Sequence, residues 1–248
     1  MFLSHILVNT GIDPDRPRPG RQWLRNRYRV HQRLCMAFPE PSRLINDRDF
    51  LKPYVPEDFG GAHIHVKRAE DAGFLFRVDS LTGGRVIILV QSAVIPNWDY
   101  AFHNADYLID APPVIKPYDP GFTEGQRLRF CIAANPTRKI DTKTKADGKK
   151  RNGRRVPVPH DQLDEWLIKR GAQNGFSIES VTSKNSYVYV NKSHEGSGHK
   201  LFCARYDGIL VVTDSDNFLK TLISGIGPGK SFGFGLLSVV PVPLSEVI

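Results

Sequence analysis

Two strand-forming runs on either side of a double glycine constrain the fold of this chain most. Residues 73–79 and 85–91 are rich in Phe, Leu, Ile and Val, and Gly83-Gly84 between them is a turn dipeptide. This arrangement predicts a β-hairpin. Any fold assigned to the chain must therefore contain an antiparallel strand pair in its first half.

The rest of the first half adds strands and helices around this hairpin. Residues 2–9 alternate enough between apolar and polar side chains to predict a strand. A helix is predicted over residues 21–38, because Pro-Gly precedes it and a proline, which cannot continue a helix, follows it. A short helix is expected at residues 98–108, and the Pro-rich run 111–121 is expected to hold an edge strand and an interdomain link.

The second half repeats this order. Strands are predicted at residues 126–134, 186–191, 201–213 and 236–242, with the third broken near Asp207-Gly208. Helices are predicted at 161–170 and 215–226, with Leu163, Trp166, Leu167, Phe218, Leu219, Leu222 and Ile223 facing inward. Two β-α-β-β-α-β halves fit this order best. We therefore predict an α+β protein with two tandem ferredoxin-like (RRM-like) domains, residues 1–120 and 121–248.

The positive charge is concentrated in two short segments. The formal net charge is +8, but residues 16–33 hold seven arginines and no acid, and residues 138–155 hold nine Lys or Arg against two Asp. These segments together carry +14, so the rest of the chain carries −6. This concentration favours a polyanionic partner, because each cation set on a phosphate releases condensed counterions. Two solvated surface segments are the plain alternative, and a membrane surface is disfavoured because neither segment has an apolar helical face.

Each basic segment has its own pattern. In the first, Arg21, Arg25, Arg29 and Arg33 repeat every four residues, which suits a solvated helix face, a phosphate track or a partner contact. In the second, Asp-Gly and Asn-Gly dipeptides predict a basic hairpin or loop. Its candidate phosphate-binding residues are Arg138, Lys143, Lys145, Lys149, Lys150, Arg151, Arg154 and Arg155.

Residues 225–235 are rich in glycine. A Walker phosphate loop would need a glycine where Ser224 stands and would open a helix, whereas this segment follows a helix and enters a strand. A helix stop with a bulged strand entry is the plain alternative, and it explains about two of the glycines. A backbone cradle for phosphate explains the others. Its candidate residues are Gly225, Gly227, Gly229, Lys230, Ser231, Gly233 and Gly235.

Tyr28 and His31 stand three residues apart, so a helix places them next to each other on one face. An imidazole accepts or donates a proton near neutral pH, and a tyrosine beside it can donate a hydrogen bond or orient a nucleophile. Alone, this spacing is also typical of two packed residues. Arg27 lies four residues before His31 and is a candidate to neutralise a phosphate there.

Motifs for a metal or a cofactor are lacking. The sequence contains no CxxC and no HExxH, and the pairs His63/His65 and His194/His199 have no set of further ligands nearby in sequence. We therefore expect no metal and no cofactor.

The cysteines and the N-terminus bear on the compartment. Cys35, Cys131 and Cys203 are scattered among apolar neighbours, which favours buried thiols in a reducing cytoplasm. No apolar run reaches the roughly 18 residues of a membrane span, and the N-terminus lacks a basic leader. A cytoplasmic protein without a membrane partner is expected.

The glycine-rich segment also carries a resemblance to a known family. Its pattern at residues 225–239, Gly-x-Gly-Pro-Gly-Lys-x-x-Gly-x-Gly-Leu-Leu-Ser-Val, resembles the glycine-rich loop of the CasE family, the CRISPR repeat endoribonucleases of the type I-E branch. The similarity continues through Phe2-Leu-Ser-His-Ile6, Tyr28-Arg-Val-His31, Val90-Gln91-Ser92, Pro96-x-Trp98, Leu128-Arg-Phe130, Ala134-Asn-Pro136 and Trp166-Leu167. Residues 43–70, longer than is usual at this point in the family, receive no assigned function.

The resemblance implies tandem ferredoxin-like domains and metal-independent cleavage of a CRISPR repeat hairpin by attack of a 2′-hydroxyl on its own phosphate. It implies catalytic roles for His31 and Tyr28, and stem binding by the second basic segment. The expected partners are the repeat RNA and other subunits of the Cascade complex. Two rivals stay open: a non-catalytic RNA-hairpin-binding module on the same fold, and a structural subunit whose arginines dock against acidic partners.

Overall fold

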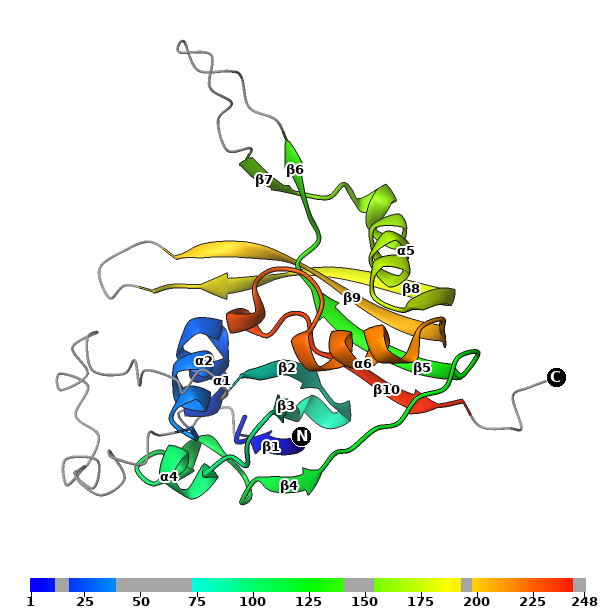
Figure 1. The fold of residues 1–248 in the computed structure, drawn as a ribbon. Coiled ribbons are helices and arrows are strands. Elements are labelled where there is room, and N and C mark those ends of the chain that lie inside the picture. The colour runs from blue at the N-terminus through cyan, green and yellow to red at the C-terminus, as the bar shows by residue number, and fades with distance from the viewer. Residues whose placement is uncertain (12–17, 39–72, 141–153, 193–197, 243–248) are drawn as a thin grey trace, which may run out of the picture. The chain divides into compact units, whose positions relative to one another are not determined.

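The structure is a computed structural model that describes residues 1–11, 18–38, 73–140, 154–192 and 198–242. Contacts within the chain divide it into two compact units (Figure 1). The first unit consists of residues 1–120, 188–201 and 230–233, and the second of residues 121–187, 202–229 and 234–248. The described chain contains two four-stranded sheets, each with an apolar core.

The first sheet is antiparallel and has the strand order β2-β3-β1-β4. Its strands are β1 (Phe2–Val8), β2 (Phe74–Ser80), β3 (Val86–Ser92) and β4 (Val114–Pro117). The predicted hairpin is confirmed as β2 and β3, joined by the 3-10 turn η3 (Thr82–Gly84) with both glycines at positive φ. Alternation along the strands brings Ile6, Phe76 and Ile88 into the core, where all three are fully buried.

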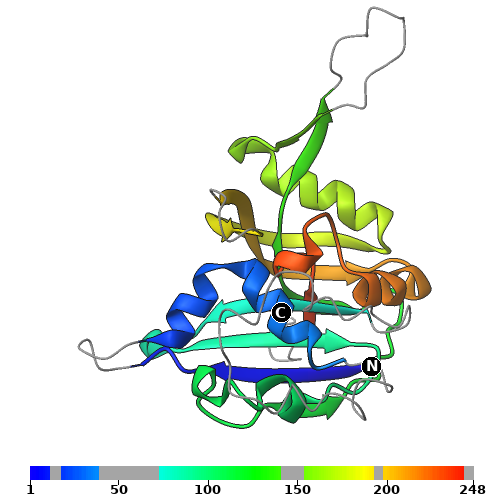
Figure 2. The same cartoon turned by 90° about the vertical axis from the view of Figure 1, so that its left-hand side faces the viewer.

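Helices lie along one face of this sheet (Figure 2). They are α1 (Pro19–Arg25), α2 (Arg27–Cys35) and α4 (Trp98–Phe102), followed by the 3-10 turn η4 (Asp106–Leu108). Their buried side chains include Trp23, Val30, Leu34 and Trp98, which pack in the core of the first sheet. The short helix expected at residues 98–108 is thus one turn and a half of α-helix and a separate 3-10 turn.

The single helix predicted over residues 21–38 is wrong: two helices meet at Asn26. Asn26 has extended backbone angles, φ −110° and ψ 102°, and its side-chain oxygen accepts a hydrogen bond from the Tyr28 N–H at 3.1 Å. An asparagine that bonds to the nearby backbone offers the chain an alternative to helical hydrogen bonding. Apolar periodicity does not reveal this break, because α1 and α2 both bury residues in the same core.

The second sheet has the strand order β10-β5-β9-β8. If the four strands of each sheet are numbered in chain order, both sheets have the order 4-1-3-2. Its strands are β5 (Arg127–Ala134), β8 (Phe176–Val190), β9 (His199–Val212) and β10 (Leu237–Pro241). Its helices are α5 (Leu163–Gln173), preceded by the 3-10 turn η5 (His160–Gln162), and α6 (Ser215–Ser224). Each half thus has the element order β-α-β-β-α-β and one sheet of this strand order. This confirms the predicted α+β fold with tandem ferredoxin-like halves.

A small two-stranded sheet projects from the second unit (Figures 1 and 2). It consists of β6 (Thr137–Ile140) and β7 (Arg154–Pro157), which pair antiparallel with Thr137 opposite Pro157. We call these two strands the β6–β7 arm. The arm occupies the two ends of the predicted basic segment, and residues 141–153 between its strands lie outside the described ranges.

Three expectations for the second half are corrected. The strand expected at residues 186–191 extends from Phe176 to Val190, and the strand expected to break near Asp207-Gly208 is continuous. Gly208 continues the strand because β8 passes so close that a Cβ would lie 2.0 Å from the Ser180 carbonyl oxygen. On α6, Ile223 is 49% exposed, and Thr221, which donates to Asn174 Oδ1 at 3.1 Å, is buried in its place.

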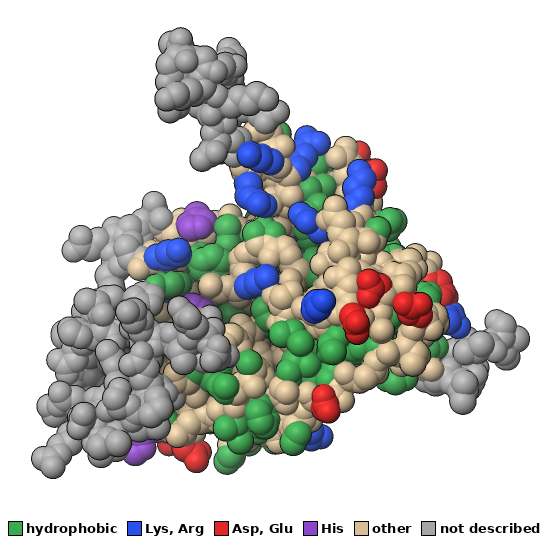
Figure 3. Space-filling model, in the orientation of Figure 1, with side chains coloured by type: hydrophobic (Ala, Val, Ile, Leu, Met, Phe, Trp, Pro, Cys, Tyr) green, Lys and Arg blue, Asp and Glu red, His purple; other side chains and the backbone are tan. Residues whose placement is uncertain are grey.

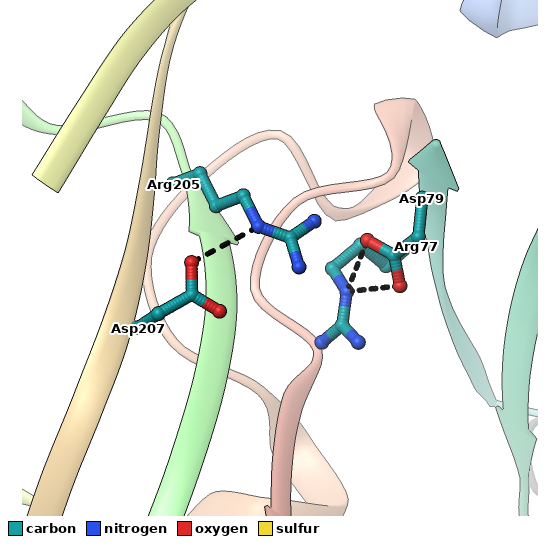
Figure 4. Close-up of polar contacts among 4 residues, drawn as sticks. All are labelled: Arg77, Asp79, Arg205 and Asp207. Atoms are coloured by element: carbon teal, nitrogen blue, oxygen red, sulfur yellow. Dashed lines mark hydrogen bonds and ion pairs between the residues drawn. The ribbon is translucent and has the colours of Figure 1, made fainter. Parts of the chain in front are cut away.

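Two strands carry an arginine followed two residues later by an aspartate, so each pair lies on one face of its strand (Figure 4). On β2, the Nε of Arg77 donates to both Asp79 oxygens at 2.9 Å, and the Arg77 side chain is only 6% exposed. On β9, Arg205 Nε lies 3.1 Å from Asp207 Oδ2 in an exposed pair. The buried guanidinium is the one that needs its partner, because a desolvated charge is costly without compensation.

Cys203 is buried, Cys35 and Cys131 are half-buried, and none of the three is in a disulfide. Among the helices that the structure describes, none is long and apolar enough to cross a bilayer.

Tyr206 connects the second sheet to the start of α5. Its side chain is fully buried, its hydroxyl donates to the Leu163 carbonyl at 3.0 Å, and its ring stacks on Trp166 with centroids 6.3 Å apart. Burial raises the pKa of the Tyr206 hydroxyl, so the group stays a neutral donor.

We expect Tyr206→Phe to lower the free energy of unfolding by about 1–2 kcal/mol, because the Leu163 carbonyl loses a buried donor. Denaturant unfolding of purified protein measures this loss. The same change at Tyr187, which is 64% exposed on β8, is the control and should leave the unfolding midpoint unchanged. Equal midpoints for Tyr206→Phe and wild type would contradict the role given to this bond.

Candidate functional site

His31 lies in the middle of α2 and is half-buried. Its ring stacks on Phe76 of β2, with centroids 6.3 Å apart and an interplanar angle of 16°, and its centroid is 5.5 Å from that of Phe74. At the ring edge, Cys35 Sγ is 3.6 Å from Nε2 and 4.0 Å from Nδ1. Aromatic packing therefore orients the imidazole while the residue stays partly accessible, as an acid–base group requires.

Tyr28 lies one turn before His31 on α2 and is also half-buried. An exposed lysine, Lys192, extends over its ring: the Lys192 Nζ is 5.8 Å from the Tyr28 centroid and 5.5 Å from the Phe232 centroid. Both distances are within the roughly 6 Å at which a cation is attracted to an aromatic face. The predicted pair Tyr28 and His31 thus has a positive charge beside it that the sequence does not indicate.

The position of Lys192 beside Tyr28 could not be predicted from the sequence, for a physical reason. It follows β8 directly and belongs to no motif, and only the folding of residues 188–201 into the first unit brings it to α2. A single lysine before a Ser/Gly-rich loop carries no pattern that distinguishes it from other surface lysines.

Part of the glycine-rich segment belongs to the same site. The 3-10 turn η6 (Lys230–Phe232) contacts α2 and β2 in the first unit. Gly233 follows with φ +84°, and a Cβ there would lie 3.0 Å from Cε2 of Phe76. Because His31 stacks on Phe76 as well, the imidazole and this segment share one aromatic neighbour. The structure therefore brings His31 and Tyr28 together with the predicted Lys230, Ser231 and Gly233.

The remaining glycines of the segment have structural reasons of their own. Gly225 ends α6 at φ +75°, and added Cβ atoms would lie 2.8 Å from Phe234 at Gly229 and 2.7 Å from the Ile226 carbonyl oxygen at Gly235. All five predicted glycines have positive φ; they are Gly225, Gly227, Gly229, Gly233 and Gly235. Internal geometry thus accounts for more of them than a helix stop and strand entry alone, and the phosphate cradle stays a prediction.

The predicted cations are distributed over both units. Arg27 begins α2 and is half-buried, and Lys230 is half-buried on η6. Arg138, Arg154 and Arg155 are exposed on the β6–β7 arm, around whose base Lys and Arg side chains gather (Figure 3). Lys143, Lys145, Lys149, Lys150 and Arg151 lie outside the described residues.

The four arginines that repeat every four residues in the sequence do not form one continuous surface. Arg21 and Arg25 lie on α1 and Arg29 on α2, and all three are exposed. Arg33 instead donates its Nη1 to the Ala101 carbonyl at 3.0 Å and to Asn104 Oδ1 at 3.1 Å. Arg33 therefore connects α2 to the end of α4 within the protein.

Within the described ranges, no group of three or more His, Cys, Asp or Glu side chains is arranged to hold a metal ion. His63, His65 and His194 lie outside those ranges, and His199 is exposed at the start of β9. What the side chains around His31 offer is proton transfer and positive charge.

Comparison with known proteins gives consistent matches over nearly the whole chain. A family described as CRISPR associated protein matches residues 1–241. The chain is 30% identical to the CRISPR-associated endoribonuclease Cse3 of Thermus thermophilus, over 97% of this chain and 100% of that protein. It is 27% identical to the CRISPR system Cascade subunit CasE of Escherichia coli, over 98% of this chain and 100% of that protein. A solved structure of the CRISPR endoribonuclease Cse3 bound to a 19-nucleotide RNA is similar, with a TM-score of 0.68, 27% identity and coverage of 97% and 100%.

We expect Gly233→Ala to destabilise the protein by about 1–2 kcal/mol, because its positive φ suits only glycine and the new methyl would press on Phe76. Thermal unfolding measures the effect. Gly73→Ala is the matched control, since a Cβ at Gly73 meets no atom within 4 Å and its φ is not positive. Equal stability of the two variants would contradict the close contact between Gly233 and Phe76.

Proposed function

This chain belongs to the CRISPR-associated protein family, in its CasE branch, and from that premise we propose its function. It is an endoribonuclease that cuts CRISPR repeat RNA beside a hairpin and keeps the product as a subunit of Cascade. The observation that carries this proposal is the oriented, half-buried imidazole of His31, one turn from Tyr28 and joined through Phe76 to the glycine-rich segment.

The reaction uses groups that the RNA and the protein supply. The 2′-oxygen of the nucleotide before the cut attacks the neighbouring phosphorus and loses its proton, the P–O5′ bond breaks, and the 5′-oxygen gains a proton. The products are a 2′,3′-cyclic phosphate and a 5′-hydroxyl. His31 transfers a proton as general base or general acid, and Tyr28 donates a hydrogen bond that orients the reacting phosphate.

Negative charge grows on the phosphate oxygens as the 2′-oxygen attacks, and preoriented positive groups stabilise it. Lys192 is placed for this by its contacts with Tyr28 and Phe232. Lys230 on η6 and Arg27 at the start of α2 are the other cations on the elements around His31. Backbone N–H groups of the glycine-rich segment, residues 225–235, are proposed to hold the adjoining phosphates.

The β6–β7 arm is proposed to bind the RNA stem. A-form RNA has a deep and narrow major groove, so basic side chains contact mainly its phosphates and reach the groove only near the end of a short stem. The exposed Arg138, Lys139, Arg154 and Arg155 supply this charge. Lys143, Lys145, Lys149, Lys150 and Arg151 are proposed to extend it.

We propose that the two ferredoxin-like halves have different functions. Residues 1–120 form the domain that carries the catalytic helix, and residues 121–248 form the domain that carries the basic segment and the glycine-rich segment. A Cascade subunit meets its RNA and its partner subunits inside the cell, so we propose a cytoplasmic location.

We expect His31→Ala to reduce the single-turnover cleavage rate of a labelled repeat hairpin by about 10²–10⁴-fold, because it removes the proton-transfer group. The affinity for the hairpin should change less than about threefold, since a single imidazole contributes little to binding beside the many cations that face the phosphates. The reaction is run in EDTA to test metal independence. His5→Ala, at an exposed histidine of β1, is the control.

Several outcomes would overturn this function. A substrate with 2′-deoxyribose at the cut should remain intact, so its cleavage at a normal rate would eliminate the mechanism. A fall of less than tenfold for His31→Ala would move the chemistry elsewhere. Tight hairpin binding by wild type without any product would favour the non-catalytic RNA-binding module.

We expect the double change Lys139→Gln with Arg154→Gln to weaken hairpin binding and to lower the slope of log K against log salt by about one to two units. Filter binding over a range of salt concentrations measures both. Lys116→Gln with Lys220→Gln removes the same charge from exposed positions on β4 and α6 and should keep the slope of wild type. An unchanged slope for the first variant would exclude the arm as the stem-binding element.

A further inference from the structure

Asn26 makes more contacts than the start of a helix requires. Its side-chain Oδ1 accepts hydrogen bonds from the Tyr28 N–H at 3.1 Å and from the Asn191 N–H at 3.0 Å. Its Nδ2 donates to the Asn191 carbonyl at 2.8 Å. One short side chain therefore caps α2 and also pairs with both main-chain groups of a residue far along the sequence.

The other helix caps show that this second function is separate from capping. Asn97 Oδ1 accepts from the Tyr100 N–H at 2.9 Å at the start of α4, and Asp214 Oδ1 accepts from the Asn217 N–H at 2.9 Å at the start of α6. In the described part of the chain, Asn97 makes no further side-chain bond. Serine or aspartate caps a helix about as well as asparagine does. A side-chain amide has both an acceptor and a donor, so it can bond to the N–H and the carbonyl of one residue at the same time.

The residue that Asn26 holds, Asn191, is the one before Lys192. Asn191 directly follows the end of β8 at the fully buried Val190, and Lys192 comes next, with its Nζ 5.8 Å from the Tyr28 ring centroid. One oxygen, Asn26 Oδ1, thus accepts from the backbone of Tyr28 and from the residue before Lys192. The amide sets where the lysine's chain lies relative to the ring beside His31.

We infer that Asn26 is a positioning residue for RNA cleavage, which acts by holding the ammonium of Lys192 in register with Tyr28 and His31. This inference rests on the proposed nuclease function of the site. A long, exposed lysine side chain has many conformations, and its charge helps a phosphate in the transition state only if its backbone is fixed. Loss of the Asn26 bonds to residue 191 should slow the chemical step without removing any charge from the RNA-binding surface.

The test compares variants that keep the cap and lose the second function. Asn26→Ser and Asn26→Asp both retain an oxygen for the Tyr28 N–H. The aspartate carboxylate has no proton to donate to the Asn191 carbonyl, and the serine hydroxyl is one bond shorter than the Asn26 Nδ2 that makes this bond. Each should reduce the single-turnover cleavage rate by about tenfold or more, with hairpin affinity within about threefold of wild type. Asn97→Ser makes the same cap exchange on α4 and should cleave at the wild-type rate.

Coupling to Lys192 distinguishes positioning from a general loss of structure. In a Lys192→Ala background, Asn26→Ser should cause little further loss, because the group that it positions is already gone. Multiplied losses in the double variant would overturn the inference, and so would a wild-type rate for both Asn26 variants or parallel losses of rate and affinity. Circular dichroism and the unfolding midpoint identify a variant that fails to fold, and the other Asn26 variant then decides.

Failure of this inference differs from failure of the proposed function. His31→Ala is measured in the same experiment. Undiminished cleavage by His31→Ala would remove the assigned site, whatever the Asn26 variants do. Loss of cleavage in His31→Ala together with wild-type rates in both Asn26 variants would remove only the positioning role.

Discussion

The stacking of His31 on Phe76 is the contact on which the proposed site depends. Phe76 is fully buried in the first core, so its ring is a fixed surface, and the imidazole packed on it keeps one orientation. Aromatic packing fixes a histidine ring through its faces, whereas proton transfer takes place at the nitrogens on its edge. The same ring meets Gly233, so one core residue determines where the helix and the glycine-rich segment approach each other.

Much of the fold follows from local sequence patterns. The hairpin of β2 and β3 was predictable because its turn glycines and its apolar runs agree, and the inward residues Trp166 and Leu167 followed from helical spacing. The break at Asn26 was not, because the decisive hydrogen bonds involve an amide whose behaviour depends on a partner brought in by tertiary folding. Gly208 shows the opposite error: a residue that usually ends a strand continues one here because a neighbouring backbone needs the space.

Some parts of the candidate site could likewise be predicted from the sequence, and others could not. Tyr28 and His31 could be paired from their spacing on one helix, and the glycine-rich segment from its composition. Their proximity to each other, and the presence of Lys192, result from contacts between residues far apart in the chain. Composition also overstated the case for a phosphate cradle, since backbone conformation and close packing require glycine at positions where a ligand seemed the better explanation.

The place of the β6–β7 arm in the chain has a consequence for how such a protein diversifies. The arm interrupts the connection between β5 and α5, and its two strands pair with each other, Thr137 opposite Pro157, before the chain returns to the helix. The pairing of β6 with β7 therefore brings the two ends of this connection together, and β6 and β7 form a sheet separate from the four-stranded sheet of the second half. Under the proposed function, a change of residues in the arm can alter which RNA stem is bound, while the helix and sheet that orient the imidazole stay unchanged.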